Sequence, residues 1–202
     1  MVLRGIARKG RPEELEAIRA MYDACTAELE GLPYLPNGVT GVFPGTEMIR
    51  EALEAGRLYV VEVSGEDEPR GSLAFFGAEE HNSASVLRRG ELVGGLIANH
   101  EGDEEYALIP WKCPAPENEI LVLHAMRMRK ACQGCGFAKA LIALAIEDAR
   151  ARGMKALRLD TLEDHPTAIH IYSSAGFEER MRMRMHYGDI GDVNAVMFEM
   201  VL

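Results

Sequence analysis

No hydrophobic run in this sequence is long enough to span a membrane, and the N-terminus, MVLRGIARKGRPEELE, lacks the apolar core of a signal peptide. Positive charge is also scarce, because 22 lysines and arginines stand against 32 acids, for a formal net charge of −10. Such an acidic chain is poorly suited to nucleic acid, whose phosphates select basic surfaces. These absences predict a cytoplasmic protein that binds neither membrane nor nucleic acid.

Cysteine is rare as well, with four in 202 residues. Without a signal peptide, we expect free thiols rather than a disulfide framework. Cys132 and Cys135 form a C-x-x-C motif, but no second pair or paired histidines completes a four-ligand zinc site, and a thioredoxin-like context is missing. We therefore expect no metal site, and we expect Cys135 to be exposed at a helix start and reactive.

What the chain does contain is an ordinary globular composition, with 48% hydrophobic residues. The length of 202 residues suffices for a core, so we expect a single domain over residues 1–202. Helical spacing of apolar residues occurs over 12–31, 46–55, 137–152 and 167–174. Strand patterns occur over 2–8, 57–63, 71–78, 119–128, 155–161, 180–187 and 194–201. The stretch SGEDEPR predicts a hairpin between the second and third of these strands.

The most informative stretch is QGCGFAK, where Gly134, Gly136 and Ala138 precede a helix. Small residues allow a close backbone approach, and a helix start offers free N–H groups, so an anion such as phosphate is expected there. A P-loop pattern is absent, and the dinucleotide fingerprint fails because Lys139 occupies its third small position. The helix is expected to bury one face, made of Ala138, Leu141, Ile142, Ala145 and Ala149.

Read as Q-x-x-G-x-A, the residues Gln133, Gly136 and Ala138 resemble the Q/R-x-x-G-x-G/A motif of the GNAT superfamily of N-acetyltransferases. Further on, HPTAIHIYSSAGF resembles that family's N-x-x-A-x-x-L-Y-x-x-x-G-F segment. Two motifs in this order, with a strand between them, are far more specific than either one alone. The sequence departs from the second motif at its first position, where His165 replaces asparagine.

The resemblance covers residues 119–179 and implies a mixed α/β (α+β) fold. In that fold a central, mostly antiparallel mixed sheet of six to seven strands is flanked by helices and splayed between the fourth and fifth strands. The cofactor-binding core is then expected at about 119–179. Residues 79–118 match nothing in the family and are expected to be an insertion or a substrate-side region.

The resemblance also implies that the cofactor is acetyl-CoA (coenzyme A). Small residues in the loop let N–H groups reach its pyrophosphate, and the strand before the loop pairs with its pantetheine arm. A local cluster of cations, Arg127, Arg129, Lys130 and Lys139, favours a polyanionic ligand. The expected cofactor-binding residues are Met126, Arg127, Met128, Gln133, Gly134, Cys135, Gly136, Phe137, Ala138, Lys139, His165 and Ala168.

Acetyl transfer to an amine requires a proton donor and a proton acceptor, and two residues are candidates for these roles. Tyr172 matches the family's general acid by position, although an amphipathic core tyrosine is the alternative interpretation. His124 lies in the strand before the loop, two residues from Met126 and on the same face, where an imidazole would suit a general base. A buried core histidine is the alternative there, and ordered water serves as the proton relay in many family members.

The resulting hypothesis is an N-acetyltransferase that moves an acetyl group from acetyl-CoA to a primary amine by direct attack in a ternary complex. The alternatives are a degenerate acyl-CoA-binding or sensor domain without turnover, and a flavin or NAD-type dinucleotide binder. The acceptor is a small-molecule or peptide amine, and a homodimer is the default assembly. Acids that can attract a cationic amine, or form a solvated face, are Glu79, Glu80, Glu91, Glu101, Asp103, Glu104 and Glu105.

The C-terminal stretch MRMRMHY alternates methionines with cations, which is typical of a strand. We expect Met181, Met183 and Met185 to face the core and the charged residues to face solvent. A wall of the acceptor site is the alternative role for this strand.

Overall fold

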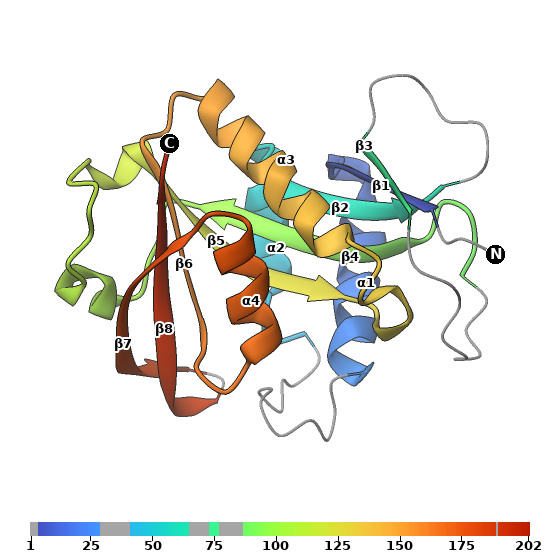
Figure 1. Ribbon diagram of the computed structural model, residues 1–202. Coiled ribbons are helices and arrows are strands. Elements are labelled where there is room, and N and C mark those ends of the chain that lie inside the picture. The colour runs from blue at the N-terminus through green and yellow to red at the C-terminus, as the bar shows by residue number, and fades with distance from the viewer. Residues whose placement is uncertain (1–3, 29–40, 65–72, 77–86, 189) are drawn as a thin grey trace.

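The computed structural model describes residues 4–28, 41–64, 73–76, 87–188 and 190–202 (Figure 1). Its strands are β1 (Arg4–Lys9), β2 (Leu58–Val63), β3 (Leu73–Phe76), β4 (Leu92–Asn99), β5 (Ile120–Met128), β6 (Ala156–Leu162), β7 (Glu178–Tyr187) and β8 (Gly191–Val201). Its α-helices are α1 (Leu15–Glu28), α2 (Thr46–Glu54), α3 (Phe137–Ala151) and α4 (Pro166–Ser174). None of the helices in these described ranges is long and apolar enough to cross a membrane.

Eight strands form one sheet in the order β3-β1-β2-β4-β5-β6-β8-β7. Helices α3 and α4 cover one face of this sheet, and α1 and α2 cover the other (Figure 1). Every neighbouring pair is antiparallel except β5 and β6, which are joined through α3 by the predicted crossover. The predicted mixed α/β architecture is therefore confirmed, with eight strands rather than six to seven.

The parallel pair is splayed. Strands β5 and β6 are paired only from Ile120 to Val122 on one side and from Ala156 to Arg158 on the other. Both strands continue beyond these residues, to Met128 and to Leu162. The predicted splay is thus present between the two strands that flank α3, which are the fifth and sixth of this chain.

The strand that the sequence did not predict is β4, at the centre of the sheet. Glycine pairs are unusual inside strands, and β4 is buried on both faces, so its sequence LVGGLIAN shows no alternation. Its glycines make room for other side chains, because a Cβ on Gly95 would lie 2.8 Å from the hydroxyl of Tyr22, and one on Gly94 would collide with Met128. Part of residues 79–118 is therefore a central strand of the sheet.

The predicted hairpin between β2 and β3 is wrong. Strand β1 lies between them and is antiparallel to both, so β2 and β3 run parallel to each other. A tight hairpin joins only antiparallel neighbours, so β2 and β3 do not form one. Local periodicity identified both strands but carried no information about which strand each one pairs with.

The predicted apolar face of α3 is confirmed for Leu141, Ile142, Ala145 and Ala149, which are fully buried. Ala138 is only half-buried, so it does not belong to that face. The helix packs against β1, β2 and β4 from the side that also holds α4. The α3 N-terminus is thereby fixed at the end of β5.

The predicted alternation of buried methionines and exposed charged residues is present in the part of β7 nearest its turn into β8. There Met185 is buried, and Met183 packs beside it in a cluster with Val122 and Met197. Met181 is 37% exposed, which contradicts its predicted core position. The reason is a register shift between Glu179 and Met181 in the pairing with β8. The interpretation of the methionine face as core is confirmed for Met185 only.

Candidate active site

A cleft of about 660 Å³ lies where β5 and β6 separate. Its walls come from β5, the end of β6, α4, the segment after β4, the turn between β7 and β8, and residues near the start of α2. It brings together six residues that the sequence singled out as candidates, and they are His124, Met126, Arg127, His165, Ala168 and Tyr172. Both predicted catalytic residues therefore line one cavity, although they are 48 positions apart in the chain.

A β-bulge in β5 shapes this cavity. The pairing of β4 with β5 shifts between Gly95 and Ile97, and Ala125 adopts the left-handed conformation with φ of +50°. As a consequence the consecutive residues from Leu123 to Arg127 all line the cleft, where a regular strand would present only alternate ones. His124 and Met126 share the cleft as predicted, but the bulge rather than simple alternation places them there.

The remaining candidate residues form the turn from β5 into α3. Gly134 and Gly136 have φ of +77° and +81°, and an added Cβ at either would meet nothing within 4 Å. Glycine is thus favoured by the backbone conformation rather than by lack of space. Gln133 and Lys139 are exposed, and the Gln133 amide donates a hydrogen bond to the carbonyl of Met128 at 3.4 Å.

Not every side chain of this turn is available to a ligand. Phe137 is 1% exposed and Cys135 is 8% exposed, so only their backbone groups can face one. The prediction of an exposed, reactive Cys135 is therefore wrong, because the turn folds this side chain into the core beside Cys132. Burial raises the pKa of Cys132 to about 12, which leaves that thiol protonated and unreactive.

All four cysteines are free, as predicted. Within the described ranges, no group of three or more histidine, cysteine or acidic side chains is arranged to hold a metal ion. The cation cluster predicted around the turn is smaller than the sequence suggested. Arg129 is paired with Glu28 at 2.7 Å and with Glu91 at 3.4 Å, so its charge is already compensated.

The tautomer of His124 follows from its contacts. Its Nε2 lies 2.9 Å from Oδ1 of Asn99 and 3.0 Å from the carbonyl oxygen of Glu101. A backbone carbonyl can only accept a hydrogen bond, so Nε2 carries the hydrogen and Nδ1 keeps the lone pair. Burial lowers the pKa of His124, against the opposing effect of Asp160, and so favours the neutral imidazole. A neutral imidazole with Nδ1 unprotonated is able to accept a proton.

Tyr172 is 6% exposed, and its ring is held between Phe177 and Phe198 at centroid distances of 6.0 and 6.2 Å. Burial, with a smaller effect of Asp160, raises the pKa of Tyr172 well above its usual value. The phenol therefore stays protonated at neutral pH and can act as a hydrogen-bond or proton donor.

An acidic wall lines the cleft near His124. It contains Asp160 together with Glu101 and Asp103. Asp160 accepts a hydrogen bond from the hydroxyl of Tyr106 at 2.7 Å and another from the hydroxyl of Tyr187. The sequence does not mark Asp160 as a cleft residue, because its partners lie in two other elements and no local pattern connects them.

The other acids predicted to attract an amine divide into three groups. Glu79 and Glu80 lie outside the described residues. Glu91 is paired with Arg129, while Glu104 and Glu105 do not line the cleft. Burial, reinforced by Asp160, raises the pKa of Asp103. The negative charge of the cleft thus belongs to residues that the fold brings together from β6 and from the segment after β4.

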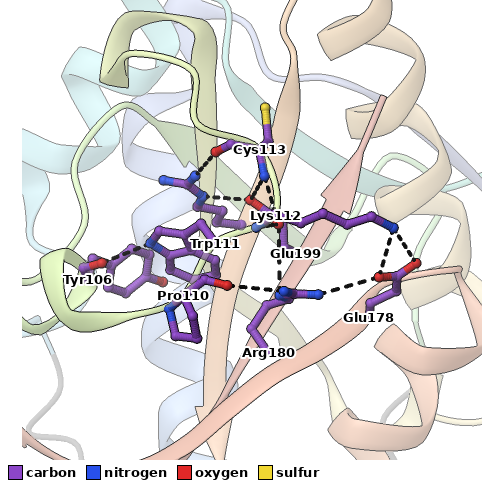
Figure 2. Close-up of polar contacts among 9 residues, drawn as sticks. Tyr106, Pro110, Trp111, Lys112, Cys113, Glu178, Arg180 and Glu199 are labelled. Carbon is purple, nitrogen blue, oxygen red and sulfur yellow. Dashed lines mark hydrogen bonds and ion pairs between the residues drawn. The ribbon is translucent and has the colours of Figure 1, made fainter.

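A buried carboxylate anchors the segment that carries Tyr106. Glu199 of β8 is 2% exposed and accepts hydrogen bonds from the backbone N–H groups of Lys112 at 2.7 Å and Cys113 at 3.3 Å (Figure 2). It also pairs with Arg158 at 3.2 Å, and that guanidinium stacks on Trp111 at 4.3 Å from the ring centroid. The connection from β4 to β5 is thereby fixed against β6 and β8.

The chain matches the family model described as "Acetyltransferase (GNAT) family" over residues 45–177. A search of curated proteins finds no match. The chain belongs to the GNAT acetyltransferase family, as the two sequence motifs predicted. The matched range includes β5, the glycine turn, α3 and α4, which contain most of the candidate residues.

Solved structures agree with this assignment at the level of the fold. The structure of yncA from Salmonella typhimurium with its cofactor acetyl-CoA has 15% identity and a TM-score of 0.64, covering 98% of this chain and 94% of that one. Ribosomal-protein-alanine N-acetyltransferase from Brucella melitensis has 18% identity and a TM-score of 0.61, covering 98% of this chain and 99% of that one. Arabidopsis thaliana NAA60 in complex with a bisubstrate analogue has 15% identity and a TM-score of 0.60, covering 98% of this chain and 97% of that one.

Proposed function

We propose that this protein transfers an acetyl group from acetyl-CoA to a primary amine by direct attack in a ternary complex. The observation that carries the proposal is the cleft between β5 and β6, which holds His124 and Tyr172 together and lies beside the glycine turn. Membership of the GNAT family supports acetyl transfer. The amine is supported by the acidic wall and by structural neighbours that are named as N-acetyltransferases.

The residues present fit acetyl-CoA. Beyond Val122, β5 has no pairing with β6, so the backbone of Met126 to Met128 offers donors and acceptors to an extended pantetheine arm. The left-handed glycines leave the turn open, and the N–H groups from Gly134 to Lys139 would hold the pyrophosphate with the positive end of α3. His165 and Ala168 of the α4 region line the same cleft. When bound, acetyl-CoA supplies the acetyl group as an activated thioester.

The protein's own residues would then carry out two proton transfers. An amine attacks only when neutral, so a base must remove its proton, and the free lone pair on Nδ1 of His124 suits that role. The departing thiolate of coenzyme A needs a proton, and the protonated phenol of Tyr172 can donate it. A backbone N–H of Met126 to Met128 would polarise the thioester carbonyl.

A binding or sensor domain without turnover is the second candidate, favoured by His165, which replaces the asparagine of the family motif. Burial and the positive charge of Arg127 lower the pKa of His165. A neutral side chain at this position still offers a hydrogen bond to a ligand, so the replacement is compatible with cofactor binding. Turnover alone separates the two candidates.

The test is a thiol-release assay with acetyl-CoA and a panel of small amines and peptides, followed by mass analysis of the products. We expect release of coenzyme A that depends on the amine, and a product heavier by one acetyl group on nitrogen. Acetyl-CoA binding without amine-dependent release from any member of the panel would favour the sensor domain instead. Binding of NADH or flavin would favour the dinucleotide binder.

A pH profile tests the role of His124. Because its pKa lies below the ordinary 6.5, kcat/KM should lose activity on the acid side with a midpoint below pH 6.5. His124→Gln should lower kcat about tenfold and remove this acid limb, with ordered water left as a slower proton relay. The same variant of His170, an exposed residue of α4 outside the cleft lining, should leave the profile unchanged. An unchanged acid limb in His124→Gln would show that another group is the base.

A further inference from the structure

The cleft contains charges of both signs. Among the described residues that line it, Arg127 is the only lysine or arginine, whereas Glu101, Asp103 and Asp160 are acidic. An acceptor that carried only an amine would have a use for the acidic wall but none for a guanidinium inside the cleft. The question is what Arg127 binds.

Arg127 is incompletely hydrogen-bonded. Its Nη1 donates to the carbonyl of Met126 at 3.2 Å, but its Nε is buried and has no hydrogen-bond partner among the described residues. Leaving a buried donor of a charged group unpaired costs about 1–3 kcal/mol, so an unpaired Nε requires an explanation, and for an arginine that lines a cavity a ligand provides one. An arginine that lines a cavity with an unpaired Nε is well suited to a carboxylate, which accepts two parallel hydrogen bonds.

A second buried donor lies on the same face of the sheet. The hydroxyl of Tyr22, from α1, is buried and lacks a hydrogen-bond partner within the described part of the chain. It lies over Gly95, and Gly95 is directly opposite Arg127 in the pairing of β4 with β5. Residues directly opposite each other in an antiparallel pair project to the same face, about 5 Å apart. The hydroxyl of Tyr22 and the Nε of Arg127 are therefore neighbouring donors without acceptors among the described residues.

The positive and the negative charge of the cleft act on different histidines. The pKa of His165 is lowered by burial and by the charge of Arg127, while the acids Asp160, Asp103 and Glu101 act on His124. The pKa of Tyr172 is raised by burial and by Asp160 and is opposed by Arg127. Both the negative charge of Asp160 and the positive charge of Arg127 thus act on Tyr172.

We propose that the acceptor is a free amino acid, whose carboxylate is bound by Arg127 with help from Tyr22, and whose amine faces His124 and Asp160. This inference rests on the proposed acetyl transfer to an amine. A protein lysine carries no carboxylate next to its amine and would leave Arg127 unpaired. Apolar residues on the cleft wall, Val42, Phe43 and Met48, provide contact for an apolar side chain of the amino acid.

The experiment compares each of a panel of apolar and polar amino acids with its own amide and its decarboxylated amine. In the wild type we expect kcat/KM to be about 10- to 100-fold higher for the acid than for the matched amide, since the amide lacks the negative charge that Arg127 would bind. Arg127→Gln should abolish this preference by raising KM for the acid while leaving the amide nearly unaffected. Arg127→Lys keeps the positive charge but cannot donate two parallel hydrogen bonds to a carboxylate, so it should retain part of the preference.

Three controls make the outcome specific. Arg150→Gln removes an exposed cation at the end of α3 and should change nothing. Tyr22→Phe should raise KM for the amino acid a few-fold while thermal stability is unchanged or higher, because it removes only an unpaired hydroxyl. The side chain of Arg127 then belongs to the acceptor site, so that only its backbone would contact acetyl-CoA. Calorimetric Kd values for acetyl-CoA should therefore be the same in the wild type and in Arg127→Gln.

The inference is overturned if amides and amines are acetylated as well as amino acids, if no amino acid of the panel is a substrate, or if Arg127→Gln weakens acetyl-CoA binding instead. In the first and third cases acetyl transfer still stands. If acetyl-CoA does not bind at all, the proposed function fails. Calorimetric titration then compares the Kd of each amino acid with the Kd of its amide. Tighter binding of the amino acid would support a carboxylate site at Arg127 independently of turnover.

Discussion

Tyr172→Phe is expected to lower kcat at least about a hundredfold while leaving the Kd for acetyl-CoA nearly unchanged. The phenol is the protonated donor of the cleft, since burial and Asp160 raise its pKa. Phenylalanine keeps the ring contacts with Phe177 and Phe198, so the substitution removes a hydroxyl without creating a cavity. Steady-state thiol release and calorimetry measure the two quantities separately.

Tyr59→Phe is the matched control for this substitution. Tyr59 is fully buried on β2 and donates a hydrogen bond to Asp148 at 2.8 Å, away from the cleft lining. Its replacement should cost about 1 kcal/mol of stability and leave kcat unchanged. Equal turnover by wild type and Tyr172→Phe would remove the acid role from Tyr172, whereas loss of acetyl-CoA binding would make it a cofactor contact.

Glu199→Ala is expected to destabilise the protein by about 3 kcal/mol or more. The change would leave the buried Arg158 without its carboxylate and two backbone N–H groups, of Lys112 and Cys113, without their acceptor (Figure 2). The side chain of Arg158 is only 12% exposed, so water compensates poorly for the loss. Chemical denaturation followed by fluorescence of Trp111, which stacks on Arg158, reports this change directly.

Glu178→Ala provides the comparison within the same cluster. Glu178 pairs with Lys112 and Arg180, but its side chain is 58% exposed, and exposed pairs contribute about 0–1 kcal/mol. Glu199→Ala should also raise KM for the acceptor more than Kd for acetyl-CoA, because the anchored segment supplies Tyr106 to Asp160. Equal stability of the two variants would contradict the anchoring role of Glu199.

Much of the fold and of the cofactor side was predictable because its signals are local. The helix α3, the glycine turn and the α4 segment each carry a pattern within about fifteen residues, and the structure places them as expected. Strand β5 was also found from its apolar run. Of these elements, β5, the glycine turn and α3 belong to the crossover whose splayed strands form the cleft.

The acceptor side was not predictable, since it depends on pairing between distant segments. Strand β4 was missed because it is buried on both faces and shows no alternation, and its Gly94 and Gly95 make room for Met128 and Tyr22. Asp160 gains its neighbours Tyr106 and Tyr187 from elements far away in the chain. The bulge at Ala125 likewise arises from a register shift against β4, and no local sequence feature marks it.

The central claim is that the turn at Gly134 and Gly136 and the splayed strands form a coenzyme A site. The most direct measurement is calorimetric titration of the purified protein with acetyl-CoA, with NADH as control. We predict one site of micromolar affinity for acetyl-CoA and no binding of NADH. Gly136→Val should weaken acetyl-CoA binding, because a β-branched residue is strained at the φ of +81° found there. Absence of acetyl-CoA binding to the folded wild-type protein would contradict the account.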